Sequence, residues 1–219
     1  MKLKIPENLT QQAYRAIRDE ILNGKIDAQQ HLTETFFATR YGISKSPIRE
    51  ALNRLESEGL ITIIPRRGAF VQEFSIHDVE EIYELRELLE AQAVRNAVLD
   101  KKALANLREI VTTAQASLEK QDKSSYILGD AAFHTTLAKA CSNQRLRKIL
   151  ESMHNQMQML RRQTFELSSH NSVKQHEQIL KALEKGQRDK AAELMAGHIV
   201  AVRKRLVDHL KKKQEQIDE

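Results

Sequence analysis

All three prolines of the chain, Pro6, Pro47 and Pro65, lie in its first third. Residues 66–219 contain no proline and few glycines, and their apolar residues recur at spacings of three and four. Proline and glycine are the residues that most often interrupt a helix, and this spacing places apolar side chains on one helical face. The last two thirds of the chain are therefore expected to form long helices, and the first third a more varied structure.

Polar stretches divide the helical part into segments. Residues at Asp100, Asp122, Asn143, Ser168–Asn171 and Gly186 each offer a helix cap or a turn. Breaks at these positions predict helices at about residues 76–98, 101–120, 123–141, 144–166, 172–185 and 188–213.

The first third has the pattern of a helix-turn-helix. Residues 10–23 have helical periodicity, and Gly42 lies where a following helix must end in a sharp turn, because glycine tolerates a left-handed backbone. Ser44 is placed to cap the next helix. Pro47 falls in the first turn of that helix, where a missing N–H has no intrahelical partner to lose.

A β-hairpin is predicted directly after these helices. Leu60–Ile64 is rich in β-branched residues, Pro65–Gly68 reads as a turn, and Ala69–Gln72 can return as a second strand. Three helices followed by a hairpin is the order of a winged helix. The expected fold is mainly α, with a winged helix-turn-helix domain in residues 1–74 and an all-α helical bundle in residues 75–219.

The predicted second helix of the helix-turn-helix carries a polar cluster near its start. Ile48, Leu52 and Leu55 form its buried stripe, and the opposite face is polar, as a recognition helix in the major groove requires. A solvated face is the alternative interpretation, but the arginines at the hairpin tip favour nucleic-acid binding. The candidate DNA contacts are Ser44, Lys45, Ser46, Arg49, Arg66 and Arg67.

Composition restricts the other classes of function. The net charge of +5 is compatible with a DNA partner but too small to indicate one by itself. Cys141 is the single cysteine, so no internal disulfide can form, and a reducing cytoplasm is expected. The N-terminus has no apolar signal core and charges interrupt the chain frequently, so neither secretion nor a membrane span is expected.

Four potential metal ligands lie on the apolar faces of different predicted helices: Asp130, His134, His176 and His198. Asp130 and His134 are four residues apart and therefore share a helical face. Buried polar groups without partners are costly, and a divalent metal would satisfy all four at once. The alternative is that each histidine is an ordinary core residue that is hydrogen-bonded to its neighbours.

The motifs SKSPIREAL and PRRGAFV resemble the winged helix-turn-helix of GntR-family bacterial transcription regulators, especially the FadR-like subfamily. The helical remainder is similar to the FCD ligand-binding domain of that subfamily. The resemblance implies that Ser44, Lys45, Ser46 and Arg49 contact bases and phosphates. It also implies that Arg66, Arg67 and Gly68 form the wing that enters the minor groove. Lys45 and Thr35 depart from the family, which has arginine at the first position and in some members at the second.

The resemblance to FCD domains also assigns the ligand cluster. It implies that Asp130, His134, His176 and His198 bind a metal; this donor set suits Zn²⁺, with Ni²⁺ or Mn²⁺ as alternatives. Such a site can leave coordination positions for a small organic acid. Arg86 is similar in position to an arginine that faces this pocket in FCD relatives, the alternative being a surface salt bridge with Glu90. Arg161 is a weaker candidate for binding the acid, the alternative being a solvated face.

These features together predict a homodimeric, sequence-specific regulator that binds double-stranded operator DNA, with repression as the expected mode. A small carboxylate effector bound at the metal would control its DNA affinity. A dedicated metal sensor is the second possibility. A metal-dependent hydrolase is disfavoured, because His134 and His176 lack the spacing of zinc hydrolase motifs and no glycine-rich phosphate loop is present.

Overall fold

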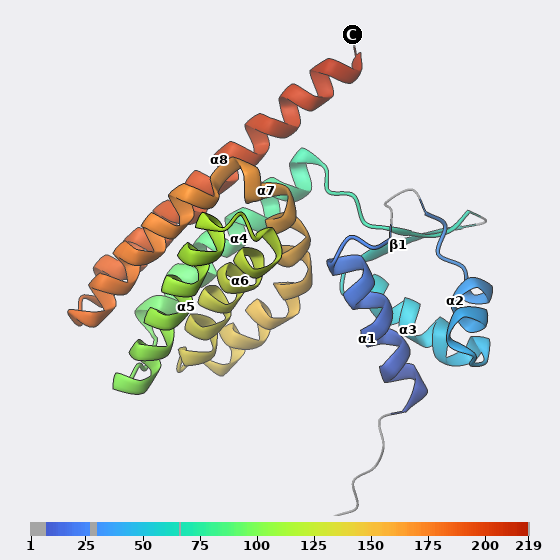
Figure 1. Ribbon diagram of the computed structural model, residues 1–219, viewed down its shortest axis with the longest axis horizontal. Coiled ribbons are helices and arrows are strands. Elements are labelled where there is room, and N and C mark those ends of the chain that lie inside the picture. The colour runs from blue at the N-terminus through green and yellow to red at the C-terminus, as the bar shows by residue number, and fades with distance from the viewer. Residues whose placement is uncertain (1–7, 27–29, 66, 219) are drawn as a thin grey trace, which may run out of the picture. The chain divides into compact units, whose positions relative to one another are not determined.

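The computed structural model describes residues 8–26, 30–65 and 67–218. The chain divides into two compact units, Met1–Glu73 and Phe74–Glu219. Both are built mainly from helices, and the first also contains a two-stranded antiparallel sheet (Figure 1). The predicted mainly α fold, with a winged helix-turn-helix followed by a helical bundle, is confirmed.

The first unit contains the helices α1 (Leu9–Leu22), α2 (Glu34–Tyr41) and α3 (Lys45–Ser57). Local chemistry fixes their ends. Thr33 caps α2 by accepting a hydrogen bond from the backbone N–H of Phe36 at 3.0 Å. At the other end of α2, Gly42 adopts a left-handed conformation with φ of 66°, which allows the chain to turn at once into α3.

The core of this unit is formed by side chains from every element. Its fully buried members include Ile17 of α1, Phe37 of α2, and Ile48 and Leu55 of α3. Because α3 buries one apolar stripe against α1, its opposite face is left to solvent, as the amphipathic pattern predicts.

The hairpin follows α3 and consists of β1 (Ile61–Ile64) and β2 (Gly68–Val71). Its antiparallel register pairs Ile61 with Val71 and Ile64 with Gly68. An additional bridge joins Leu32 to Ala69, so the segment before α2 lies against the outer strand of the wing.

The second unit is a helical bundle. The most extensive packing is between α4 and α8 and between α7 and α8. The core is one large apolar cluster that includes Tyr83, Phe133, Leu160 and Ile199. The bounds of its helices are α4 (Ile76–Arg95), α5 (Lys101–Glu119), α6 (Lys123–Ala140), α7 (Gln144–Glu184) and α8 (Arg188–Asp218).

The predicted break at residues 168–171 is wrong, because α7 is one continuous helix of 41 residues. The other predicted breaks are confirmed, with side chains of Asp100, Asp122 and Asn143 capping α5, α6 and α7. Serine, histidine and asparagine have only modestly lower helix propensity than alanine, and no glycine or proline accompanies them here. A polar run of this kind therefore remains helical when apolar residues on either side of it, such as Phe165 and Val173, are packed in a core.

Within the described residues, no helix is both long enough and apolar enough to cross a membrane.

Candidate functional site

The polar face of α3 presents the predicted DNA-reading residues to solvent. Lys45, Ser46 and Arg49 are exposed, and Asn53 is exposed on the same face of the helix. Ser44 occupies the N-cap position of α3, but its side chain makes no capping hydrogen bond. Its hydroxyl is therefore available to an external acceptor or donor such as a phosphate oxygen.

The start of α2, the recognition helix and the hairpin border one open hollow of about 350 Å³. Lys45, Arg49 and Asn53 line it from α3, and Gly68 lines it from β2. Arg67 is exposed at the turn of the hairpin, whereas Arg66 lies outside the described residues. The structure thus brings three of the predicted contact residues to one concave surface: Lys45 and Arg49 of α3 and Gly68 of the wing.

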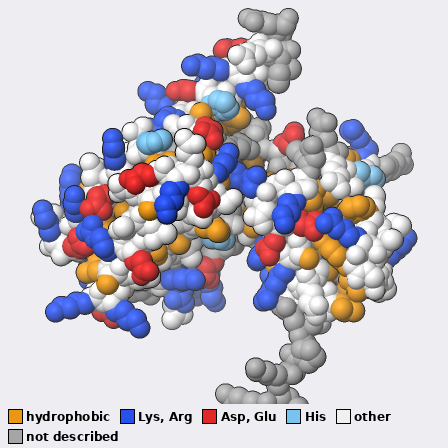
Figure 2. Space-filling view, in the orientation of Figure 1, with side chains coloured by type: hydrophobic (Ala, Val, Ile, Leu, Met, Phe, Trp, Pro, Cys, Tyr) orange, Lys and Arg blue, Asp and Glu red, His pale blue; other side chains and the backbone are white. Residues whose placement is uncertain are grey.

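Positive and negative side chains are mixed on the surface of both units. On the face seen in Figure 2, the blue Lys and Arg side chains of each unit are interspersed with red Asp and Glu side chains. This agrees with the small net charge of +5. Recognition must therefore depend on the placement of individual groups, since no large field of one sign covers that face.

In the second unit, three histidines from three helices converge. His134 of α6, His176 of α7 and His198 of α8 each offer a ring nitrogen, and these nitrogens lie within 4.8 Å of one another. The Nε2 atoms of His176 and His198 are 3.3 Å apart. All three side chains are buried. These three residues, called the His triad below, therefore form a polar cluster inside the core of the second unit.

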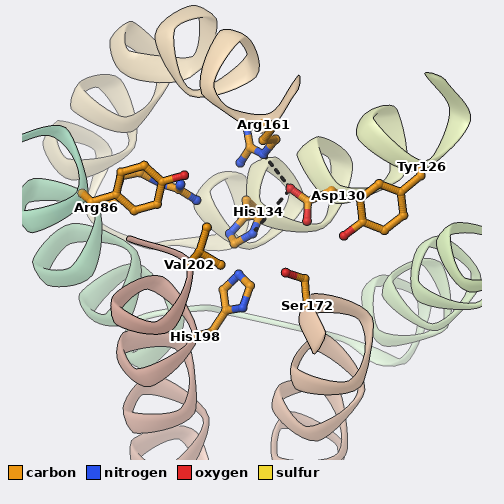
Figure 3. Close-up of a pocket in the computed structure, with 9 residues that line it drawn as sticks. Arg86, Tyr126, Asp130, His134, Arg161, Ser172, His198 and Val202 are labelled. Atoms are coloured by element: carbon orange, nitrogen blue, oxygen red, sulfur yellow. Dashed lines mark hydrogen bonds and ion pairs between the residues drawn. The ribbon is translucent and has the colours of Figure 1, made fainter. Parts of the chain in front are cut away.

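Asp130 lies beside the His triad and is held by Arg161 of α7. The Nε atom of Arg161 donates a hydrogen bond to Oδ2 of Asp130 at 2.6 Å. The other oxygen of Asp130 is 3.8 Å from Nε2 of His176, and Oδ2 is 4.0 Å from Nε2 of His134. Figure 3 shows the carboxylate between Arg161 and His134. All four predicted ligands are therefore neighbours, and Arg161 is buried rather than on a solvated face.

Arg86 lies in the same buried region, on α4. Its Nε donates to Oε1 of Glu90 at 2.8 Å, and the second oxygen of Glu90 contacts Nδ1 of His134. The predicted alternative for Arg86 was an exposed salt bridge with Glu90. The pair exists, but its side chains are only 3% and 5% exposed.

Burial sets the protonation states of these groups. It disfavours the imidazolium form and lowers the pKa of His176 to about 3, and it lowers the pKa of His198 well below its usual value. Burial alone would raise the pKa of Asp130, but Arg161 and the neighbouring histidines outweigh it and lower that pKa. At neutral pH the cluster therefore combines neutral imidazoles of His176 and His198 with the ionised carboxylate of Asp130, the forms that bind metals.

A small cavity of about 20 Å³ adjoins these groups. A water molecule needs about 10–15 Å³ measured in this way, so the space holds about one water-sized group. The hydroxyl of Tyr83 and Nε2 of His134 are buried at this cavity and have no hydrogen-bond partner among the described residues. The residues that line the cavity are Tyr83, Arg86, Tyr126, Asp130, His134, Arg161, Ser172, His198 and Val202 (Figure 3).

Sequence reasoning missed Glu90 and Tyr83 as members of this site. Both lie at helical spacing from Arg86, with Glu90 four residues after it and Tyr83 three before it. They continue the same face as the core residues Val79 and Val94. This pattern of polar side chains on the apolar face of one helix was the signal that could have identified them.

Comparison with known proteins supports both units. Residues 9–71 match the model of the bacterial regulatory proteins of the gntR family, and residues 81–201 match the FCD domain. A helix-turn-helix (HTH) transcriptional regulator from the TAR-I ttuE-ttuC' intergenic region of Agrobacterium vitis is 36% identical over 137 residues, which cover 60% of this chain and 80% of that protein. The transcriptional repressor RspR of Escherichia coli K12 is 25% identical over 90% of this chain and 89% of its own length.

The fold has counterparts among solved structures. A GntR regulator from Rhodococcus aligns with a TM-score of 0.79 at 21% identity, covering 91% of this chain and 97% of that one. The relatives are transcriptional regulators rather than enzymes, and repressors occur among them. The chain therefore belongs to the GntR family of bacterial regulatory proteins and is a DNA-binding transcriptional regulator with a C-terminal FCD domain.

Proposed function

We propose that this regulator is a repressor that reads its operator with the exposed face of α3 and with the wing. In this proposal Lys45 and Arg49 contact base edges in the major groove, and Ser44 and Ser46 contact phosphates. Arg66, Arg67 and Gly68 form the wing contact in the minor groove. The observation that supports this assignment is the concave surface that Lys45, Arg49 and Gly68 share.

The His triad with Asp130 is proposed to bind a divalent metal, with Zn²⁺ favoured and Ni²⁺ or Mn²⁺ as alternatives. The donor atoms fit such an ion. Two Zn–N bonds of about 2.0–2.1 Å at the tetrahedral angle place their nitrogens about 3.3 Å apart, and the Nε2 atoms of His176 and His198 are separated by 3.3 Å. The unpartnered, buried Nε2 of His134 supplies the third nitrogen.

Each metal ligand is oriented by the rest of the chain. Gln175 accepts a hydrogen bond from Nδ1 of His198 at 2.9 Å, which leaves Nε2 of that histidine unprotonated and directed into the cluster. Arg161 fixes the carboxylate of Asp130. When bound, the metal would supply a Lewis acid site at which an anion can complete the coordination.

Charge favours a carboxylate as the effector. The buried charges of Arg86 and Glu90 cancel, as do those of Arg161 and Asp130. A divalent ion bound among neutral imidazoles therefore adds two positive charges that these residues do not balance, and an uncompensated buried charge is costly. We propose that a small organic acid supplies the negative charge, with Arg86 and Arg161 as the candidate effector-binding residues.

The size of the cavity connects acid binding to conformational change. With room for about one water-sized group, the site admits an acid only if lining side chains such as Val202 move. The acid then shifts the DNA-binding equilibrium by its difference in affinity for the two conformations, a coupling that is typically about 1–3 kcal/mol.

The test compares two matched pairs of histidine substitutions. His134→Ala/His176→Ala should abolish metal retention and the response to organic acids, with operator binding by the metal-free protein preserved. His170→Ala/His209→Ala, which removes two exposed histidines, should change neither. Metal content by elemental analysis and operator affinity by gel shift with and without acids are the measurements. A metal-replete His134→Ala/His176→Ala protein would contradict the proposal.

A dedicated metal sensor is the second candidate, and the small cavity of about 20 Å³ favours it because an ion needs no further space. Titration of metal into the metal-free protein distinguishes the two. A change in operator affinity with metal alone, and no further change with a panel of organic acids, would indicate sensing of the metal itself.

We also propose a homodimer, because one wing and one short helix contact too few bases for a specific site in a genome. Leu85 and Leu88 are exposed on one face of α4, at 49% and 63%, and we propose that this pair lies in the subunit interface. Leu88→Glu should yield a monomer in sedimentation. Leu128→Glu, which removes an equally exposed leucine from α6, is the matched control and should leave the dimer intact.

A further inference from the structure

Glu90 stands between an arginine and one of the three clustered histidines. Its Oε1 accepts a hydrogen bond from Nε of Arg86 at 2.8 Å, and its Oε2 contacts Nδ1 of His134. Glu90 is 4% exposed, and its two partners are 2% and 5% exposed. The three side chains thus form a buried series of polar contacts from α4 to α6, in which water does not compete for the hydrogen bonds.

The contact with Glu90 determines which nitrogen of His134 carries the proton. An ionised carboxylate can only accept hydrogen bonds, so Nδ1 must donate. In a neutral imidazole the other nitrogen, Nε2, then holds a lone pair. That atom is buried, has no hydrogen-bond partner in the described part of the chain, and belongs to the side chain that meets His176 and His198.

Arg86 holds Glu90 from the side opposite His134. A guanidinium donates hydrogen bonds and accepts none, so its ion pair with Oε1 favours the ionised form of the carboxylate. The carboxylate then accepts from both partners at once. The prediction that Arg86 binds the effector does not explain the contact between Glu90 and His134.

We propose that Glu90 is a positioning residue for the metal site, which orients His134 and fixes its proton on Nδ1 so that Nε2 is presented to the ion. The inference rests on the proposed metal at the His triad. A carboxylate behind a ligating histidine sets the tautomer and raises the basicity of the ring, and loss of such a partner typically weakens metal binding about 10–100-fold. A purely structural ion pair that joins α4 to its neighbours would have no such effect on the metal.

Two double variants separate these roles, and both remove the buried charges together so that neither partner is left unpaired. Arg86→Met/Glu90→Met removes the acceptor behind His134. Arg86→Gln/Glu90→Gln keeps an amide oxygen that can accept from Nδ1. A matched control, Arg95→Met/Asp189→Met, removes an exposed ion pair that also joins α4 to another helix, α8.

The first measurement is the affinity for Zn²⁺ by competition with a chromophoric chelator, together with the absorption spectrum of the Co²⁺ form. The methionine pair should bind Zn²⁺ about 10–100-fold more weakly and with an altered Co²⁺ spectrum. The glutamine pair should retain most of the affinity, and the Arg95→Met/Asp189→Met control should match the parent. Unchanged affinity in the methionine pair, or equal losses in both pairs, would overturn the role of Glu90.

The second measurement needs no metal, so it separates this inference from the proposed function. Long-range ¹H–¹⁵N correlations report the tautomer of His134 in the metal-free parent, and we expect the proton on Nδ1. A proton on Nε2 would overturn the inference even if metal binds. If the parent has the expected tautomer but binds no Zn²⁺ or Co²⁺, the metal site itself is wrong and Glu90 has no metal ligand to position.

Discussion

The carboxylate of Glu34 accepts two hydrogen bonds from the guanidinium of Arg49, at 2.7 Å from Nε and 2.9 Å from Nη2. The hydrogen bond from Arg49 lowers the pKa of Glu34. Arg49 remains 63% exposed in this pair, so the interaction adds little to stability. Its effect is to hold the guanidinium of a proposed base contact in one orientation at the edge of the surface shared by α3 and the wing.

Arg49→Ala should weaken specific operator binding by about 1–3 kcal/mol, because an arginine bound to a base edge contributes discrimination of that size. The stability of the helical unit should not change. Arg54→Ala is the matched control, since Arg54 is a second arginine of α3 and is also paired with a glutamate, Glu58. Gel-shift titration on operator and on unrelated DNA tests the pair. Equal operator affinities for Arg49→Ala and the parent would remove Arg49 from the interface.

Arg67→Ala should weaken DNA binding and make it less dependent on salt. An arginine near phosphates or in a narrow minor groove acts partly by releasing counterions, so its loss reduces the slope of log affinity against log salt by about one. Lys25→Ala removes one exposed positive charge elsewhere in the same unit and should leave the slope nearer that of the parent. Superimposed lines for Arg67→Ala and the parent would show that the wing makes no DNA contact.

Gly68→Ala should destabilise the winged unit. Gly68 has φ of 94°, and a Cβ atom there would lie 1.7 Å from Nε2 of His31, whose ring stacks on Phe70. A left-handed backbone costs a non-glycine residue about 1–2 kcal/mol before any clash is counted.

Denaturant titration of three variants separates the free-energy cost of the left-handed backbone from the cost of the clash with His31. Gly42→Ala measures the backbone cost alone, because Gly42 has φ of 66° and no atom within 4 Å of its added Cβ. Gly68→Ala should be the more destabilising of the two, and adding His31→Ala should reduce the difference. If Gly68→Ala proves no worse than Gly42→Ala, then the wing adapts to the clash without cost.

Acid should destabilise the metal-free protein at a higher pH than carboxylate titration would predict. The folded-state pKa of His176 is lowered to about 3, whereas an unfolded histidine titrates near about 6.5. Below about pH 6.5 the unfolded chain binds protons that the buried ring cannot, so the free energy of unfolding falls as pH falls, by at most about 1.4 kcal/mol per pH unit for each such histidine.

Urea titrations between pH 7 and 5 in the presence of a chelator measure the slope of the unfolding free energy against pH. His176→Asn should reduce it because the replacement does not titrate, while His209→Asn changes an exposed residue and should leave it as it was. A parent whose unfolding free energy is constant from pH 7 to 5 would show that His176 and His198 are not buried in their neutral forms.

The sequence by itself determined the features that depend on neighbours along the chain. Gly42 ends α2 because its backbone can turn left-handed, and Asp100 starts α5 because its side chain accepts a hydrogen bond from the N–H of Ala103. Apolar spacing placed the three histidines and Asp130 on buried helical faces. Each of these follows from interactions within a few residues, which a linear pattern records.

Only the tertiary structure decided which of these faces meet. The convergence of His134, His176 and His198 depends on the packing of α6, α7 and α8, and no spacing along the chain encodes it. The continuity of α7 through residues 168–171 was likewise decided by packing, because weak local preferences yield to a buried apolar stripe. Glu90 was visible as the neighbour of Arg86 on α4, but its contact with His134 links residues 44 positions apart, and burial of both side chains makes that contact decisive.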